Sequence, residues 1–243
     1  GVDFFFVLSG FLITTLLLRE EDRNGYFSLR GFYWRRFLRI VPVYFLVVTI
    51  LAIYYIVLKD QKEFLSLLPF YYLFLSNFLV DNIPMLAPTW SLSVEEQYYL
   101  VWPLLLLLTP RRYVLHVLTG LIAFNLVAVS GALRVIGIEP IEMGPLIIKM
   151  FTATYAPILI GSGLAILLHN KAGFEALGKV LGYRSAAPVT FLLLLALVNF
   201  RPQDVTVWPN LLIHLTMASC LTSIVIREDH ALQRAFICRP MVR

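Results

Sequence analysis

The chain has 243 residues, of which 59% are hydrophobic and 14% charged, and its mean hydropathy is +0.80. A water-soluble domain carries about a quarter charged residues and under half apolar ones, so the composition excludes a soluble globular domain. The net charge of +5 comes from basic residues that stand between apolar runs. Membrane orientation and anionic lipid headgroups explain this charge better than binding to nucleic acid does.

The apolar runs predict an all-α fold, a polytopic transmembrane helical bundle with seven to eight hydrophobic helices. A helix that crosses a bilayer core needs roughly 20 apolar residues, and these runs are longer than barrel strands and lack their alternation. The expected spans lie at about 2–19, 40–58, 64–80, 93–109, 114–135, 145–169, 185–200 and 206–226. We expect one integral-membrane domain over residues 1–243, truncated at both ends, because the chain starts inside an apolar run and stops in a basic segment.

The loop between the first two expected spans predicts the orientation of the bundle. It is richer in cations than any other loop: Arg19, Arg23, Arg30, Arg35, Arg36 and Arg39. Loops rich in arginine and lysine stay on the cytoplasmic side, so the segment from Arg19 to Arg39 is expected to face the cytoplasm. The other basic loops fall on the same side if 64–80 is a re-entrant or tilted segment rather than an ordinary span.

The first polar cluster is the string GVDFFFVLSGFLIT at residues 1–14. Asp3 lies at the end of this span that is opposite the arginine-rich loop, and an ionisable group at membrane depth indicates a functional role by default. A helix-capping or headgroup role is the alternative for Asp3. Ser9 and Gly10 are small residues of the kind that let helices approach closely, so we interpret both as structural.

The second polar cluster is the string WRRFLRIVPVY at residues 34–44. Arg36 and Arg39 are three residues apart and so share one face of a helix at its cytoplasmic end. Guanidinium groups bind phosphate oxygens bidentately, which makes these two arginines, together with Arg35, candidates for binding a phosphate-bearing substrate. The alternative is an ordinary positively charged membrane anchor.

The third polar cluster is the string TWSLSVEEQYYL at residues 89–100. Ser93 and Glu96 fit a capping box at the start of a helix, which gives Glu96 a structural interpretation. Glu95 is not explained in this way, and a desolvated carboxylate there is a candidate proton carrier or partner of an imidazole. The candidate substrate-binding residues of this segment are Trp90, Ser91, Gln97 and Tyr99.

The four histidines, His116, His169, His214 and His230, belong to no acyl-transfer motif. None begins an HxxxD pattern, the sequence has no GxSxG elbow, and His214 has no acidic residue one helical turn away. We interpret all four as packing or interfacial residues. The sequence also lacks the signatures of a metal site, a phosphate-binding loop or a dinucleotide-binding loop.

The strings GVDFFFVLSGFLIT, RRFLRIVPVY and TWSLSVEEQYYLVWP, in this order and spacing, resemble the membrane-bound acyltransferase family 3. Members of that family acylate lipopolysaccharide O-antigens, peptidoglycan, Nod factors or macrolides. The resemblance is tight over roughly residues 1–110 and rests on hydropathy and length beyond them. It implies a helical bundle in a bacterial inner (plasma) membrane that moves an acyl group from cytoplasmic acyl-CoA to a sugar hydroxyl, usually on the far side.

The resemblance also implies roles for individual residues. Arg36 and Arg39 match the paired arginines that the family associates with the acyl-CoA donor, and Glu95 matches the acid of the third string. The family's essential histidine lies on a helix that precedes GVDFFFVLSG, and a further helix usually closes the bundle. This chain is therefore expected to lack the first and last helices and not to turn over alone.

The sequence departs from the family pattern before Gly161. Many members carry an arginine and an aspartate where this chain, aligned on that glycine, has Thr154 and Ala156. This departure puts polar contacts from that helix in doubt, and with them the acceptor that the protein uses.

Together these features predict an enzyme, a membrane-embedded O-acyltransferase that transfers an acetyl or other acyl group. Its donor substrate is acyl-CoA, its acceptor is a carbohydrate of the cell envelope, its other partner is membrane lipid, and neither a bound cofactor nor nucleic acid is expected. Glu95 and Asp3 would assist a histidine in accepting the proton of the acceptor hydroxyl. The alternative is a multi-helix transporter or flippase of glycans or lipid-linked substrates, although the repeated halves or paired broken helices of such proteins are absent from the sequence.

Overall fold

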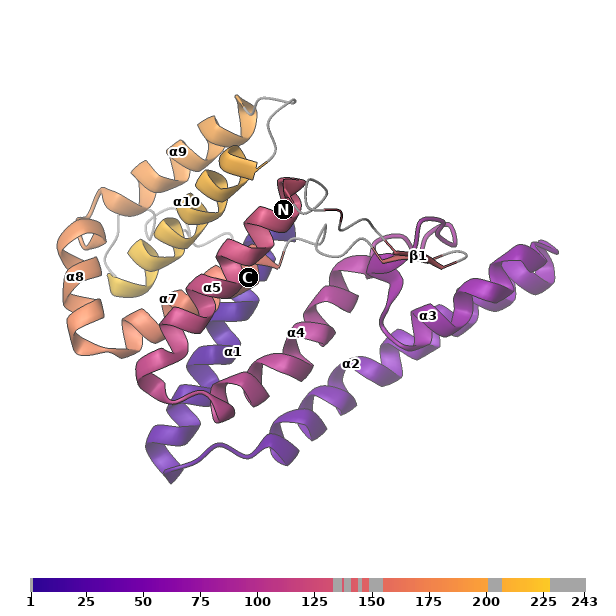
Figure 1. The fold of residues 1–243 in the computed structure, drawn as a ribbon, viewed down its shortest axis with the longest axis horizontal. Coiled ribbons are helices and arrows are strands. Elements are labelled where there is room, and N and C mark those ends of the chain that lie inside the picture. Colours follow the sequence, from indigo (N-terminus) through magenta and orange to yellow (C-terminus); the bar gives the residue numbers. More distant parts are fainter. Residues whose placement is uncertain are drawn as a thin grey trace, which may run out of the picture. The chain divides into compact units, whose positions relative to one another are not determined.

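The structure is a computed structural model that describes residues 2–132, 137, 141–143, 146–148, 155–200 and 207–227. The chain divides into two compact units. The first consists of residues 1–25, 115–130 and 154–243, and the second of residues 26–114 and 131–153. Helices dominate the described parts of both units (Figure 1), so the all-α fold class is confirmed.

The first unit is a bundle of helices. Its members are α1 (Val2–Asn24), most of α5 (Arg111–Val129), α7 (Ala156–His169), α8 (Lys171–Leu181), α9 (Ala186–Asn199) and α10 (Val207–Ile226). α1 packs along α7, and α9 lies beside α10. Figure 1 shows α8 running crosswise from α7 to α9, with which it makes a bend of 74°.

Two glycines let α1 and α7 touch backbone to backbone. A side chain at Gly10 would collide with the carbonyl oxygen of Ile158, and a side chain at Gly161 would collide with the carbonyl oxygen of Val7. Small residues at a crossing are typical of helix pairs in membranes, where close packing rather than exclusion of water holds helices together. The structural interpretation of Gly10 is therefore confirmed.

Apolar side chains of α1, α7, α9 and α10 fill the interior of the first unit. The buried members are Val7, Phe11, Ile160, Leu164, Ala165, Leu194, Ile213, Met217, Ala218 and Leu221. The outward faces of the same helices are also apolar, as at Leu16, Leu192 and Trp208. A helix that is apolar on all sides is typical of a membrane span.

The second unit combines two long helices with several short ones. Its members are α2 (Leu29–Ala52), the π-helix η1 (Ile53–Leu58), the 3-10 helix η2 (Lys62–Leu67), α3 (Leu68–Tyr72), the 3-10 helix η3 (Ser76–Phe78), α4 (Thr89–Leu108), β1 (Ile141–Met143) and β2 (Leu146–Ile148). η1 continues α2 without a break, and α2 packs against α3 and α4. The two strands form a short antiparallel hairpin in which Glu142 is opposite Ile147.

The expectation of seven to eight spanning helices is wrong. Among the described residues, four helices are long and apolar enough to cross a membrane: α1, α2 continued by η1, α5 and α10. The count is five if the bent pair of α8 and α9 forms one span. Within the segment 64–80, the chain is divided among η2, α3 and η3, so it forms no single spanning helix.

Length and polarity explain the remaining differences. α7 and α9 have 14 residues each, which at about 1.5 Å per residue is shorter than a bilayer core of about 30 Å. Part of the expected span at 145–169 lies outside the described residues. α4 is long enough, but its first half carries Glu95, Glu96 and Gln97.

Tyr71, which is fully buried in the second unit, ties the broken segment to its surroundings. Its hydroxyl accepts a hydrogen bond from the Ile83 backbone N–H at 3.1 Å and donates one to Asn82 Oδ1 at 3.1 Å. The Tyr44 hydroxyl of α2 donates to the Tyr71 backbone carbonyl at 2.9 Å. These tertiary hydrogen bonds thus fix the position of segment 64–80, whose short helices have few internal hydrogen bonds of their own.

Tyr71→Phe is expected to lower the free energy of unfolding by about 1–3 kcal/mol, because the buried Ile83 N–H loses its acceptor. Tyr54→Phe is the matched control, since Tyr54 is exposed on η1, and its effect should stay within about 0.5 kcal/mol. Thermal unfolding in detergent measures both variants. Equal loss of stability in the two would contradict the role assigned to the Tyr71 hydroxyl.

Candidate functional site

The candidate residues from the sequence fall into both units. Arg35, Arg36 and Arg39 lie on α2, and the candidates of the third polar cluster lie on α4, so all of these belong to the second unit. Asp3 lies in the first turn of α1 and belongs to the first unit. The structure thus gives two sets of contacts, one on α2 and α4 and one at the start of α1.

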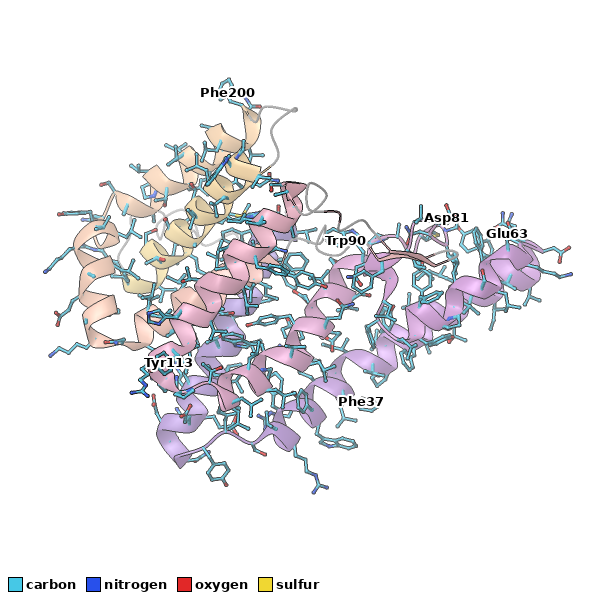
Figure 2. The ribbon with its side chains drawn as sticks, viewed as in Figure 1. Phe37, Glu63, Asp81, Trp90, Tyr113 and Phe200 are labelled. Atoms are coloured by element: carbon cyan, nitrogen blue, oxygen red, sulfur yellow. The ribbon has the colours of Figure 1, made fainter. Side chains whose placement is uncertain are left out.

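The first turns of α2, and Ser28 just before them, line a surface cavity. The Ser28 Oγ caps this helix by accepting a hydrogen bond from the Gly31 backbone N–H at 3.1 Å. A cavity of about 760 Å³ lies here and is lined by Ser28, Arg30, Gly31, Tyr33, Trp34 and Phe37, a size typical of sites for small molecules. The rings of Trp34 and Phe37 are stacked and exposed, and Figure 2 shows Phe37 pointing away from the helix.

Arg36 is partly buried and packs against α4. Its guanidinium carbon lies 3.4 Å from the centre of the Tyr99 ring and 5.5 Å from that of Phe32, an arrangement in which the ring faces attract the cation. The same guanidinium interacts electrostatically with the Glu96 carboxylate. Arg39, one turn along α2, is exposed instead, so the two arginines differ in environment. Arg35 is exposed as well.

The capping box predicted at the start of α4 is wrong. α4 begins at Thr89 rather than after Ser93, which is fully buried inside the helix. Ser93 Oγ lies within hydrogen-bonding distance of Ser76 Oγ at 2.8 Å, and Ser76 Oγ within that of Thr89 Oγ1 at 3.1 Å. Thr89 Oγ1 also donates to the Leu86 carbonyl at 2.7 Å. Contacts with η3 therefore take the place of a local cap.

Three of the candidate substrate-binding residues differ strongly in exposure. Trp90 is partly exposed and stands at the start of α4, where Figure 2 labels it. The Ser91 Oγ donates a hydrogen bond to the Pro88 carbonyl at 3.1 Å and so helps to form the first turn. Tyr99 is buried beneath the Arg36 guanidinium. Trp90 and Ser91 are therefore accessible to a ligand, whereas Tyr99 packs with Arg36 in the contact between α2 and α4, which we call the α2–α4 wall.

Gln97, the fourth candidate, connects α4 to the segment that precedes it. Its Nε2 donates hydrogen bonds to the Phe74 carbonyl and to Asn77 Oδ1, each at 2.8 Å. Both donor positions of the amide are thus occupied within the protein. This contact gives Gln97 a structural role in holding the residues around η3 against α4.

Two adjacent carboxylates on α4 are wholly or partly buried. Glu95 is only 4% exposed. Oε1 of Glu96 is buried and has no hydrogen-bond partner within the described part of the chain, while Arg36 supplies the opposing charge. Glu96 is therefore a candidate functional residue. From the sequence it had been interpreted only as part of a helix cap. Its partner comes from another helix, so no local signal in the sequence reveals it.

At the start of α1, Asp3 meets a histidine that the sequence interpretation assigned to packing. Asp3 Oδ2 lies 3.8 Å from Nε2 of His214 on α10, and the His214 side chain is 4% exposed against 39% for Asp3. A second pair of this kind joins the other end of α1 to the end of α7, with Asp22 Oδ2 at 3.3 Å from His169 Nε2. Both members of the second pair are much more exposed than His214. The partners in each pair are far apart along the chain, which hides the pairs from sequence analysis.

The position that departs from the family pattern is only partly visible. Thr154 lies outside the described residues, as does His230. Ala156 is the buried first residue of α7 and supplies no polar side chain there. The start of α7 therefore packs through apolar groups, as Ala156 and Ile158 illustrate.

Comparison with known proteins identifies the family. The model of the acyltransferase domain matches residues 1–237. An uncharacterized protein of Haemophilus influenzae is 34% identical over 195 residues, which cover 73% of this chain and 78% of that protein. The peptidoglycan O-acetyltransferase OatA of Listeria monocytogenes is 35% identical over 120 residues, which cover 44% of this chain and 19% of OatA. No solved structure matches the chain. Since the family model covers nearly the whole sequence and several helices are apolar enough to span a bilayer, the chain belongs to the acyltransferase domain family and is an integral membrane protein.

Proposed function

We propose that the protein is an O-acyltransferase that moves an acyl group from cytoplasmic acyl-CoA to a hydroxyl of a cell-envelope glycan. The acyl group that we propose is acetyl. Membership of the acyltransferase family supports acyl transfer, and one relative is named for O-acetylation of peptidoglycan. The observation that carries the proposal is the Arg36 guanidinium on the face of Tyr99, where it also interacts with the Glu96 carboxylate of α4.

The donor binds at the start of α2 in this proposal. Arg35 and Arg39 are exposed and hold the phosphates of acyl-CoA through charge-assisted hydrogen bonds. The exposed rings of Trp34 and Phe37 offer a flat surface on which the adenine can stack. Arg36 points toward α4 instead, where it contacts Tyr99 and Glu96. We assign it the role of holding α2 and α4 together beside the thioester.

The acceptor binds near the start of α4, where Trp90 and Ser91 are accessible. Its oxygen attacks the thioester carbonyl carbon, the carbon–sulfur bond breaks, and the departing thiolate takes up a proton to leave as CoA thiol. Glu95 of the second unit and Asp3 of the first are separate candidates for the carboxylate that accepts the proton of the acceptor hydroxyl or orients the group that does so. Tyr99, which packs against Arg36, and Gln97, which binds the residues around η3, hold α4 in position.

The proposed setting is a bacterial inner membrane with the segment from Arg19 to Arg39 in the cytoplasm, where acyl-CoA is made. The arginine content of that segment supports this orientation. The transporter or flippase alternative loses its support once the family is known, since the family is one of acyltransferases.

Replacing Arg36 and Arg39 together with alanine in the full-length protein is expected to weaken binding of acetyl-CoA by about 10-fold or more, because each arginine contact with a phosphate or with the wall contributes at least 1 kcal/mol. Arg39→Ala alone should weaken binding without changing thermal stability, since its side chain is exposed. Arg36→Ala should reduce both affinity and stability, because it removes the contact with Tyr99. Equilibrium binding of acetyl-CoA to the protein in nanodiscs measures the first effect.

Arg112→Ala is the matched control for this experiment. Arg112 is also exposed and also lies over an aromatic ring, that of Tyr113 at 4.6 Å, but it stands at the start of α5. Its replacement should leave the affinity unchanged. If the double variant binds acetyl-CoA as tightly as the wild type does, the donor site is elsewhere.

A further inference from the structure

We propose that His214 is the positioning residue of Asp3, whose carboxylate it holds at the start of α1 so that Asp3 can accept a hydrogen bond from the acceptor hydroxyl. The inference rests on the proposed function and adds a residue that belongs to none of the three polar sequence clusters. It is carried by the contact between the two side chains, by their unequal exposure and by the apolar surroundings of the imidazole.

The surroundings of His214 leave Asp3 as its charged partner. An imidazole buried in an apolar bundle costs free energy unless a polar group compensates it. α7 and α9, which also pack against α10, contain no aspartate, glutamate, lysine or arginine in their described spans, and neither does α10 itself. α8 packs against α10 as well, but its charged residues, Lys171, Glu175 and Lys179, are exposed. On α1, the other charged residues stand at its far end, from Arg19 onward. Within the part of the chain that the structure describes, the charged group in contact with the ring is thus the Asp3 carboxylate.

The two side chains are exposed to very different degrees. The Asp3 side chain is 39% exposed, whereas that of His214 is 4% exposed. Within the described residues, the carboxylate is therefore accessible to a ligand, whereas the imidazole is not. This division assigns contact with the acceptor to Asp3 and orientation of the carboxylate to His214.

The unused ring nitrogen agrees with this assignment. Within the described residues, His214 Nδ1 is buried and has no hydrogen-bond partner. In a neutral imidazole one nitrogen carries the hydrogen and the other is an acceptor. An arrangement with the hydrogen on Nε2 directs the donor at Asp3 and leaves an uncharged lone pair in the apolar interior. The distance of 3.8 Å is slightly longer than a hydrogen bond, and contacts of this kind tighten when substrate binds.

During transfer, Asp3 accepts the proton of the acceptor hydroxyl as the acceptor oxygen bonds to the thioester carbonyl carbon. The carbon–sulfur bond breaks, and the thiolate takes up that proton and leaves as CoA thiol. His214 keeps its own hydrogen throughout and maintains the direction of the carboxylate. A role in packing alone would require the shape of the imidazole but not its N–H donor.

Two replacements of His214 with similar size and opposite polarity separate these roles. Glutamine keeps an N–H donor that can reach Asp3, whereas methionine fills the space without one. In membranes that contain the full-length protein, transfer is measured as the label from radiolabelled acetyl-CoA that enters base-labile esters of envelope glycan. We expect His214→Gln to stay within about 5-fold of the wild type and His214→Met to lose about 30-fold or more, with acetyl-CoA affinity unchanged.

A double-mutant cycle tests whether His214 acts through Asp3. Asp3→Asn should also reduce transfer, and combining it with His214→Met should add little further loss, because both changes break the same contact. The matched control is His169→Met, since His169 makes a similar contact with Asp22 at 3.3 Å at the other end of α1, where both groups are exposed. Ion pairs between exposed groups contribute little, so this control should transfer acetyl groups at the rate of the wild type.

Several outcomes would overturn the assignment of His214. Wild-type transfer by His214→Met would reduce the residue to packing, and independent losses in the cycle would separate it from Asp3. Failure of both His214→Gln and His214→Met to insert would assign the residue to the fold. If wild-type membranes transfer no acetyl group, the proposed function itself fails. Thermal unfolding of the four proteins of the double-mutant cycle, which are the wild type, Asp3→Asn, His214→Met and the double variant, then decides whether Asp3 and His214 are coupled.

Discussion

Glu95→Gln is expected to lower the rate of acyl transfer by about 100-fold or more while leaving insertion and acyl-CoA affinity unchanged. Glutamine has nearly the size of glutamate and keeps two polar atoms, but it can neither hold a negative charge nor accept a proton. Glu95 is almost completely buried within α4, where a carboxylate is costly to keep unless it serves a purpose. Loss of turnover at constant affinity would be the mark of a group that acts in the chemical step.

Glu63→Gln is the matched control for this prediction. Glu63 lies on η2, is exposed to solvent and is labelled in Figure 2 at the end of the second unit. Its replacement removes the same charge without touching the wall formed by α2 and α4, so transfer should be unaffected. If Glu95→Gln transfers acetyl groups as fast as the wild type does, then Glu95 has a structural role instead.

Gly161→Ala is expected to destabilise the protein by about 3 kcal/mol, at the upper end of the usual cost of overpacking. The new methyl group would collide with the carbonyl oxygen of Val7, and neither helix backbone can move without disturbing the other contacts between α1 and α7. A flexible side chain could yield at such a point, but a backbone carbonyl within a helix is fixed by its own hydrogen bond. The loss should therefore appear in the thermal stability of the protein in detergent.

Gly163→Ala provides the control on the same helix. A methyl group at Gly163 would approach Leu118 Cδ1 at 3.8 Å, which is an ordinary contact. This variant should be as stable as the wild type, or slightly more stable because alanine favours the helix. Equal destabilisation at the two positions would mean that helix α7 tolerates no substitution at all, rather than that the crossing itself is tight.

The sequence predicted the membrane class and the long helices, because both follow from local composition. α1, α2 and α10 lie where apolar runs lie, although α1 and α2 extend into polar loop sequence. The number of spans was overestimated because hydropathy does not reveal where a chain breaks. At residues 64–80 the breaks are stabilised by tertiary hydrogen bonds such as those of Tyr71.

The candidate site was predicted in part, and its missing members share one physical cause. Arg36, Glu95 and Asp3 stand in unusual strings, so the sequence alone marks them as candidates. Glu96 and His214 are noticed only when the helices are packed, because Arg36 and Asp3 reach them from distant parts of the chain. The local capping pattern at Ser93 was misleading for the same reason, since contacts with η3 replaced it.

The close crossing of α1 and α7 also sets an order of assembly. The Ser162 Oγ approaches the Gly10 carbonyl at 3.5 Å although 152 positions separate the two residues. During synthesis α1 enters the membrane long before α7 has been made. The side of α1 that carries Gly10 therefore first contacts lipid or another helix. The packing of α1 against α7 is consequently a late step in the folding of the first unit. A variant that prevents this packing, such as Gly161→Ala, should be degraded by proteases rather than accumulate as a folded but inactive protein.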